Sequence, residues 1–386
     1  MSTTEAGVPA ITLTEAELDR HVTHAPTRGL LTGPGLPADT DLLTFSPLRT
    51  HGLRTLGDAT DGPFHLAEEL RGRLVIGELL NPAGMDRESI LLDGATGEIT
   101  TAYLFDPAEW RPFAPSLDTL LRFAAVTEEL SGLRGRFAAL AGQYGPGTAA
   151  EATRRLLALF EEGTDGAVPP YWKAAALIRP LALAAGPGTA SGLTLDVPAR
   201  VLDQEFGYGR VVRFEEIDLP ATLTHEPTRR FLRETGLPEE AVLFHADTDA
   251  PLPTLTEYFT TERPDDRVLA TLPAHAGHLV RLGYLVEDNS LVVDGRTGAV
   301  LTFSEPGATL HALNTDVSTL AFTLWLLHHE RTIDEHLSRE LTTTAYDQLA
   351  AAMIHTLTAV DPTPLLPDTA WHYWTELFQD EAGGVL

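Results

Sequence analysis

Apolar positions along the chain follow two periods, one typical of strands and one typical of helices. Short β-branched or alternating apolar runs at 211–214, 278–285, 290–293 and 299–303 predict strands. Apolar residues at helical spacing follow over 317–327 and then in two later clusters. These clusters are Tyr346, Leu349, Met353, Ile354 and Leu357, and Trp371, Trp374, Leu377 and Phe378. Runs of strands followed by runs of helices favour an α+β fold over a doubly wound sheet.

Turn and capping residues separate these elements. Pro227 suits the first turn of a helix over 227–232, and Gly236 with Pro238 predicts where that helix ends. The segment 294–298 begins with Asp-Gly, which tolerates the positive φ of a tight turn. We therefore expect it to join the strands on either side into an antiparallel hairpin.

The first half of the chain repeats this order. Strands are predicted at 74–76, 90–92 and 98–103, and an apolar helix at 117–130. The segment 11–37 also aligns with the segment 201 residues later without a gap, and eleven of the 27 positions are identical. The identical pairs are Glu15/Glu216, Leu18/Leu219, Thr23/Thr224, His24/His225, Pro26/Pro227, Thr27/Thr228, Arg28/Arg229, Leu31/Leu232, Gly35/Gly236, Leu36/Leu237 and Pro37/Pro238.

Later landmarks keep nearly the same offset, which indicates a tandem duplication. They are 92–99 with 293–300, 116–120 with 316–320, and Tyr171-Trp172 with Tyr373-Trp374. We predict two copies of one domain, at 10–182 and 200–386, joined by a flexible Gly/Pro/Ala linker at 183–199. The paired Tyr-Trp motifs are expected to be core anchors.

Three segments of the second copy resemble SUKH superfamily immunity domains of actinobacteria. They are 223–232 with 236–238, 291–301 and 313–322. The likeness covers most of 205–386. It is weaker over 11–180, where Phe113-Ala114-Pro115 replaces the Asn-Thr-Asp that precedes the long helix of the second copy.

This resemblance implies two SUKH-like α+β domains, each a mostly antiparallel sheet flanked by helices. It also implies an immunity protein, or antitoxin, that binds and neutralises a cognate bacterial toxin, often a nuclease or a nucleic-acid deaminase. The family supplies no catalytic residues, and we expect a non-catalytic protein without a cofactor.

Charge and composition agree with that expectation. The formal net charge is −28, which disfavours nucleic acids and anionic membranes and favours a basic protein partner. The chain has no Cys, so disulfides and thiolate chemistry are excluded. We see no signal peptide and no run long enough to span a membrane, and we expect a cytoplasmic protein.

The second copy carries most of the charge. Residues 1–200 hold 25 acidic and 16 basic side chains, a net of −9, whereas 201–386 hold 30 and 11, a net of −19. The densest acidic stretch is interleaved with aromatic residues, as in many protein interfaces. Its candidate partner-binding residues are Asp247, Asp249, Glu257, Tyr258, Phe259, Glu262, Asp265 and Asp266. A solvated acidic loop region is the plainer interpretation of the same stretch.

The usual enzyme motifs are missing from the sequence. It has no G-x-S-x-G, no Walker A loop and no H-E-x-x-H, and the Gly-rich segment 207–212 precedes a strand rather than a helix. The best metal candidate is 328–336, which holds three His and three acids. Because His328 and His336 stand about 12 Å apart along a helix, we assign no metal site and leave a metal-dependent enzyme as the least favoured alternative.

His24 and Arg28 recur as His225 and Arg229. In each copy, an acidic residue lies nine positions before the His. A structural role, with the His capping the helix that Pro opens, explains these repeat-retained positions most simply; partner contact and catalysis remain alternatives. A non-catalytic scaffold with two related domains also remains an alternative to the immunity protein. We expect the second copy to carry the binding surface.

Overall fold

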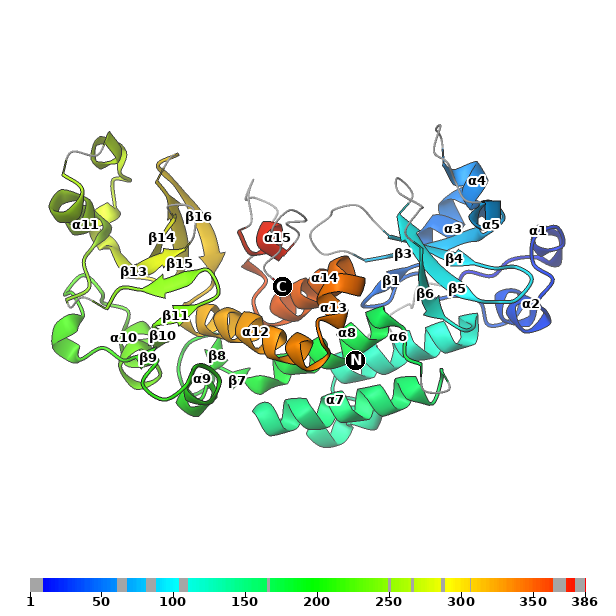
Figure 1. Cartoon of the computed structure of the whole chain (residues 1–386), viewed down its shortest axis with the longest axis horizontal. Coiled ribbons are helices and arrows are strands. Elements are labelled where there is room, and N and C mark those ends of the chain that lie inside the picture. Colours follow the sequence, from blue (N-terminus) through cyan, green and yellow to red (C-terminus); the bar gives the residue numbers. More distant parts are fainter. Residues whose placement is uncertain are drawn as a thin grey trace, which may run out of the picture. The chain divides into compact units, whose positions relative to one another are not determined.

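The computed structural model describes residues 10–60, 68–80, 88–103, 110–164, 167–248, 251–264, 267–285, 289–305, 307–363, 373–378 and 386. The chain divides into two compact units (Figure 1). The N-terminal unit comprises Met1–Ala141 with Ala152–Ala176, and the C-terminal unit comprises Gly142–Glu151 with Leu177–Leu386. No helix in the described part is long and apolar enough to cross a membrane.

The N-terminal unit is built on a six-stranded antiparallel sheet in the order β1-β3-β4-β5-β6, with β2 also pairing with β3. Its strands are β1 (Leu43–Thr44), β2 (Arg54–Thr55), β3 (Leu74–Leu79), β4 (Glu88–Leu92), β5 (Ile99–Tyr103) and β6 (Arg111–Ala114). Its helices are α1 (Glu15–Leu18), α2 (Ala25–Thr32), α3 (Ser46–His51), α4 (Leu56–Ala59), α5 (Glu68–Arg71), α6 (Leu117–Ser131) and the 3₁₀ helix η1 (Gly135–Leu140). The helices α7 (Pro146–Glu161) and α8 (Pro170–Ile178) contribute residues to both units.

The C-terminal unit contains a second six-stranded antiparallel sheet, in the order β11-β12-β13-β14-β15-β16. These strands are β11 (Glu240–Ala241), β12 (Phe244–Ala246), β13 (Leu279–Leu285), β14 (Asn289–Asp294), β15 (Val300–Ser304) and β16 (Thr309–Asn314). Two small two-stranded sheets pair β7 (Gly186–Pro187) with β8 (Leu195–Asp196), and β9 (Val211–Val212) with β10 (Leu237–Pro238). The two units confirm the predicted α+β fold.

The C-terminal unit also contains α-helices and 3₁₀ helices. The α-helices are α9 (Ala199–Phe206), α10 (Glu226–Glu234), α11 (Leu255–Glu262), α12 (Val317–His336), α13 (Glu340–Thr344), α14 (Tyr346–Val360) and α15 (Tyr373–Phe378). The 3₁₀ helices are η2 (Arg179–Ala184), η3 (Glu216–Asp218), η4 (Arg267–Thr271) and η5 (Ala276–His278). Asp316 caps α12 by accepting hydrogen bonds from the backbone N–H groups of Ser318 (2.8 Å) and Thr319 (3.3 Å).

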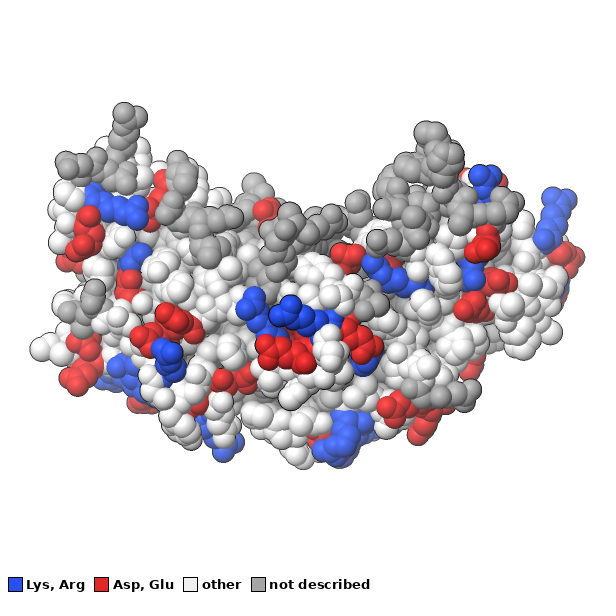
Figure 2. Space-filling model, in the orientation of Figure 1, with Lys and Arg blue, Asp and Glu red and all other residues white. Residues whose placement is uncertain are grey.

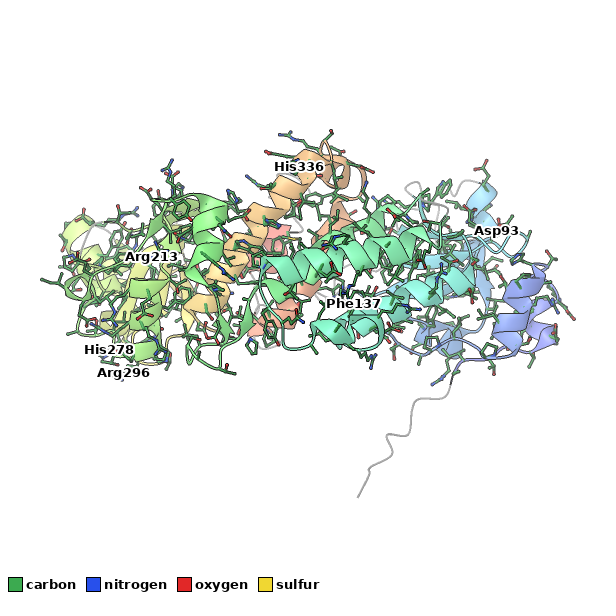
Figure 3. The ribbon with its side chains drawn as sticks, turned by 90° about the horizontal axis from the view of Figure 1, so that it is seen from below. Asp93, Phe137, Arg213, His278, Arg296 and His336 are labelled. Atoms are coloured by element: carbon green, nitrogen blue, oxygen red, sulfur yellow. The ribbon has the colours of Figure 1, made fainter. Side chains whose placement is uncertain are left out.

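The two sheets repeat each other in register as well as in strand order. A bulge interrupts β3 between Val75 and Gly77, and another interrupts β13 between Arg281 and Gly283. The predicted hairpin turn is present in both units. Asp93, labelled in Figure 3, accepts from the Ala95 and Thr96 N–H groups, and Asp294 accepts from the two corresponding N–H groups at 2.8 and 3.1 Å. The tandem duplication read from the sequence is therefore a duplication of one fold.

The Tyr-Trp motifs are core anchors in both units, as predicted. Trp172 and Trp374 are fully buried, and each places its indole N–H on a partner near the start of the long helix. Trp172 Nε1 donates to the Phe113 carbonyl at 2.9 Å, and Trp374 Nε1 donates to Asn314 Oδ1 at 3.0 Å. Trp371, predicted beside Trp374, lies outside the described residues.

The segment predicted as a flexible linker is folded. Its middle forms the β7–β8 hairpin, and Thr194 donates from its N–H and its hydroxyl to Asp316 Oδ2, both at 2.6 Å. The Leu195 N–H donates to Ser318 Oγ at 3.0 Å. Gly and Pro residues therefore mark tight turns here rather than a loose joint, because side chains at the N-terminus of α12 supply the hydrogen bonds that the sequence pattern does not reveal. We refer to Gly186–Pro198 as the connector.

Candidate interaction face

One side of the C-terminal sheet is covered in part by α11, and we call this side the α11 face. Its apolar part is a core cluster of Leu255 and Phe259 from α11 with Leu279, Val292 and Phe303 from the strands. Strand pairing places His245, Tyr284, Ser290 and Phe303 opposite one another in one row across β12 to β15. Since paired residues point to the same side of a sheet, the row runs from exposed aromatic groups to the buried core.

Arg281 lies at the centre of the α11 face and is only 5% exposed. It makes an ion pair with Asp247, and its Nε donates to Ser290 Oγ at 3.2 Å. The guanidinium carbon also lies 4.0 Å from the centre of the Tyr258 ring. A buried guanidinium is tolerated only when its charge and donors are matched, and these three partners supply that match.

The polar contacts continue beyond Arg281 across the sheet. The Ser290 hydroxyl donates to Glu305 Oε1 at 3.2 Å, and Arg263 donates to Glu305 Oε2 at 2.6 Å. Asp247, Arg281, Ser290, Glu305 and Arg263 therefore form one connected network. This network links β12, β13 and β14 to the segment after β15 and to the end of α11, and it fixes the aromatic rings beside it.

Two rings at the edge of the α11 face are open to solvent. Tyr284 is 44% exposed, and its ring stacks on His245 with centroids 4.9 Å apart and planes 19° from parallel. Glu240 lies on the neighbouring strand with Oε1 3.9 Å from His245 Nδ1. Exposed, pre-ordered aromatic rings beside carboxylates are the features that anchor protein interfaces and favour a cationic side chain from a partner.

The structure places the predicted partner-binding residues in different environments. Asp247 and Tyr258 meet on Arg281, and Glu262 is exposed at the end of α11. Glu257 is exposed but serves as the N3 residue of the α11 capping box with Thr254. The prediction for Phe259 is wrong, because its ring is fully buried in the core cluster. Asp249, Asp265 and Asp266 lie outside the described residues.

Sequence reasoning missed His245, Arg281 and Tyr284. A single Arg inside an otherwise apolar strand was the available signal for Arg281, since a buried cation needs a partner. Tyr284 was harder to assign, because the bulge before Gly283 changes which side chains of β13 point to the α11 face.

The N-terminal unit has the same fold without these groups. By strand register, Thr44, Glu78, Ser89 and Ala102 occupy the row, and Val75 stands at the bulge where β13 has Arg281. Ala59 follows the N-cap of α4 at the position that Tyr258 has in α11. Val75, Leu91 and Ala102 instead join a small apolar cluster with Leu56 and Leu70. Ser89 therefore matches Ser290, whereas His245, Tyr258, Arg281 and Tyr284 have no counterpart of the same kind at the matching positions of the N-terminal unit.

The repeat-retained His and Arg residues make the same contacts in both units. His24 Nδ1 lies 2.8 Å from Thr27 Oγ1, and His225 Nδ1 lies 2.8 Å from Thr228 Oγ1. Each His is the N-cap residue of its helix, yet neither side chain caps a backbone N–H, which corrects that part of the prediction. The backbone N–H of His24 instead donates to the Gly94 carbonyl at 3.0 Å, so the helix is tied to the hairpin turn.

The two arginines complete this junction. Arg28 pairs with Glu15 and donates to the Val22 carbonyl at 2.9 Å. Arg229 pairs with Glu216 and donates to the Leu223 carbonyl at 2.8 Å. The hydrogen bond from Arg229 is the main reason that the pKa of the Glu216 carboxyl is below its ordinary value. These contacts hold α2 and α10 in place, and they account for the retained positions by a structural role.

The metal candidate does not form a site. His328 and His329 both face Glu205 on α9, with Nδ1 to carboxylate distances of 3.3 and 2.9 Å. Burial raises the pKa of Glu205, but hydrogen bonds from the two imidazoles outweigh it and lower the value to about 2. Within the described ranges, no group of three or more His, Asp or Glu side chains is arranged to hold a metal ion.

Charge on the visible surface is mixed. Figure 2 shows carboxylates and basic side chains interleaved on the face in view, without one continuous acidic patch among the coloured residues. On this face, therefore, the acidic side chains do not gather into one region.

Comparison with known proteins identifies the class to which this duplicated α+β fold belongs. A family model described as SUKH-4 immunity protein matches residues 4–161 and again residues 197–380. The chain belongs to the SUKH-4 immunity protein family and contains two copies of its domain. No curated protein and no solved structure matched the chain.

Proposed function

We propose that this protein is a non-catalytic, cytoplasmic antitoxin that neutralises a cognate bacterial toxin by binding it through the α11 face of its C-terminal unit. Membership of an immunity family supports the role. The location rests on one observation: the buried Arg281 lies against the rings of Tyr258 and Tyr284, and the N-terminal copy has Ala59, Val75 and Glu78 at these three positions. Groups that one copy of a duplicated fold has and the other copy lacks are the best candidates for its binding function.

The charge of the chain favours a basic toxin. The C-terminal half has a net charge of −19, against −9 for the first 200 residues. A nuclease or nucleic-acid deaminase presents a basic substrate groove, and an anionic inhibitor gains both association rate and specificity against such a surface. Glu240, Glu257 and Glu262 supply exposed carboxylates around the α11 face.

A non-catalytic scaffold is the second candidate. Two related units in one chain can engage two sites and gain effective concentration without any toxin. The two functions differ in a cellular test, because only an antitoxin protects cells from a toxin.

The test is co-expression of the full chain with the toxin encoded beside its gene. We expect wild-type protein to restore growth and Tyr258→Ala/Tyr284→Ala to lose at least tenfold in protection. The matched control is Glu78→Ala, which alters the position of the N-terminal unit that corresponds to Tyr284, and it should protect like wild type. Wild-type protein that protects from no such toxin contradicts the antitoxin role, and full protection by the double variant contradicts the location.

A further inference from the structure

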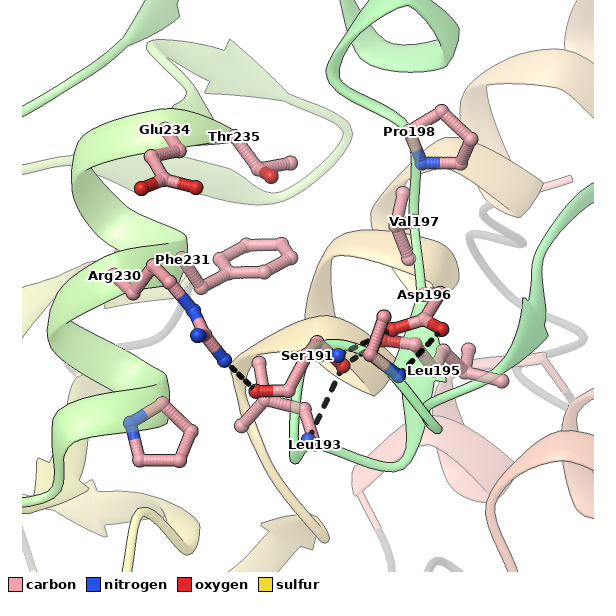
Figure 4. Close-up of a pocket in the computed structure, with 12 residues that line it drawn as sticks. Ser191, Leu193, Leu195, Asp196, Val197, Pro198, Arg230, Phe231, Glu234 and Thr235 are labelled. Atoms are coloured by element: carbon pink, nitrogen blue, oxygen red, sulfur yellow. Dashed lines mark hydrogen bonds between the residues drawn. The ribbon is translucent and has the colours of Figure 1, made fainter.

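A pocket of about 390 Å³ lies within the C-terminal unit, between the connector and α10. Figure 4 shows the connector on one side and the α10 side chains on the other. Leu193, Val197 and Pro198 form its apolar wall on the connector, and Arg230, Phe231 and Glu234 face it from α10. The pocket shares no residue with the α11 face.

The connector wall is held by its own contacts. Asp196 accepts hydrogen bonds from the Ala190 and Ser191 N–H groups at 3.1 and 2.8 Å, which fixes the turn of the hairpin. Thr194 and Leu195 are bonded to the start of α12. These bonds order the pocket in the free protein, and an ordered site avoids the entropy cost of forming on binding.

Arg230 is partly buried at the pocket, whereas Glu234 is exposed at its edge. Arg230 donates from Nη2 to the Ser191 main-chain carbonyl, and this is its one hydrogen bond to the part of the chain that the structure describes. Glu234 follows one turn later on α10, where a carboxylate ordinarily pairs with such an arginine. Because the guanidinium is turned toward Ser191, the Glu234 carboxylate has no ion-pair partner among the described residues.

These groups are absent from the first copy. At the repeat offset, Gly29 and Gly33 stand where the second copy has Arg230 and Glu234, and Leu30 stands in place of Phe231. Of the connector wall, Leu193 lies between the two matched segments, and Val197 and Pro198 stand at the very start of the second. The charged groups of the pocket are therefore not part of the sequence that the two copies share.

We propose that this pocket is a second contact site for the toxin, which takes an extended, basic segment of it. A main-chain carbonyl of that segment accepts from Arg230, as Ser191 already does, and a Lys or Arg side chain pairs with Glu234. Neighbouring apolar side chains pack between Phe231 and Val197. This inference rests on the proposed function for the identity of the partner, whereas the preference of the pocket for a basic segment follows from its own groups.

Two blocked tripeptides test that preference, acetyl-Leu-Arg-Leu-amide and acetyl-Leu-Glu-Leu-amide, titrated against the full chain by isothermal titration calorimetry. We expect the Arg peptide to bind at least fivefold more tightly than the Glu peptide. Glu234→Gln should remove that difference, and Arg230→Gly, which restores the residue of the first copy, should weaken both peptides. Glu226→Gln is the matched control, since it neutralises a carboxylate of α10 outside the pocket lining.

The inference would be overturned if the wild-type protein bound the two peptides with equal affinity or bound neither of them. It would also be overturned if Glu234→Gln discriminated between the peptides as well as the wild type does. These outcomes are distinct from failure of the proposed function. If wild-type protein protects cells but does not discriminate between the peptides, the pocket proposal alone fails. If it discriminates between them but protects from no neighbouring toxin, the antitoxin role alone fails.

Discussion

Arg281 stacks on Tyr258, with its guanidinium carbon 4.0 Å from the ring centre, while Asp247 neutralises its charge. The cation belongs to a central strand, the ring to α11 and the carboxylate to the end of β12. One buried side chain thus orders three elements of the α11 face, and its loss has consequences for both stability and binding.

Arg281→Met should destabilise the C-terminal unit by about 3 kcal/mol, because it leaves the Asp247 carboxylate largely buried without a cation. Chemical denaturation followed by circular dichroism measures the change. The control is Arg210→Met, which removes an exposed ion pair with Glu239 and should cost less than about 1 kcal/mol. Equal effects of the two substitutions would show that Arg281 is not part of a buried network.

Gly298→Ala and Gly97→Ala should each destabilise their own unit by more than about 1 kcal/mol. Both glycines have φ of +81°, and an added Cβ would overlap the Nδ1 atom of His225 or His24. Gly29→Ala is the control, because it lies inside α2 with nothing within 4 Å of the added atom, and it should stabilise by about 0.5–1 kcal/mol. Thermal unfolding measures all three. If both variants unfolded at the temperature of the wild type, the packing of each His against its hairpin turn would be contradicted.

Glu330→Gln should make the protein more stable above pH 7. Burial, and then the neighbouring Asp334, raise the pKa of Glu330 from 4.5 to about 7, so its protonated form is favoured in the folded state. Stability therefore falls as pH rises from 4.5 through 7, by up to about 3 kcal/mol at one pKa unit per 1.36 kcal/mol. The free energy of unfolding, measured from pH 5 to pH 8, should be flatter in the variant. An unchanged slope would contradict this assignment.

Glu205→Gln should have the opposite effect at low pH. The pKa of Glu205 is lowered from 4.5 to about 2 by hydrogen bonds to His328 and His329 that outweigh its burial, so the carboxylate stabilises the fold above pH 4.5. That contribution is lost as pH falls from 4.5 through 2. The variant should lose about 1–3 kcal/mol at pH 6 and little at pH 2. A loss of the same size at both pH values would indicate a packing defect instead.

The sequence predicted the elements well because each one has a local cause. The hairpin at 294–298 was predicted from Asp294-Gly295, and Asp294 does accept hydrogen bonds within the turn, but the positive φ falls on Gly298. The long helix that starts at Val317 was predicted from the apolar spacing over 317–327. The duplication was visible because the same caps, turns and core residues recur at one offset. Phe259 was misplaced for the opposite reason: an aromatic residue between acids suggests an interface, yet only tertiary packing decides which way a helical residue points.

The connector and the α11 face could not be derived from pattern alone. The Gly and Pro content of the connector predicts flexibility, and the bonds that order it come from Asp316 and Ser318, more than 120 residues away. The convergence of Asp247, Tyr258 and Arg281 likewise depends on long-range strand pairing. The Gly283 bulge shifts that pairing by one residue.

Hydrogen–deuterium exchange of the full chain, alone and bound to the toxin encoded beside its gene, tests the central claim most directly. We predict that protection on binding concentrates on β12, β13 and α11, and that the corresponding elements of the N-terminal unit, β1, β3 and α4, exchange as before. Protection confined to the N-terminal elements, or equal in both copies, would contradict the account.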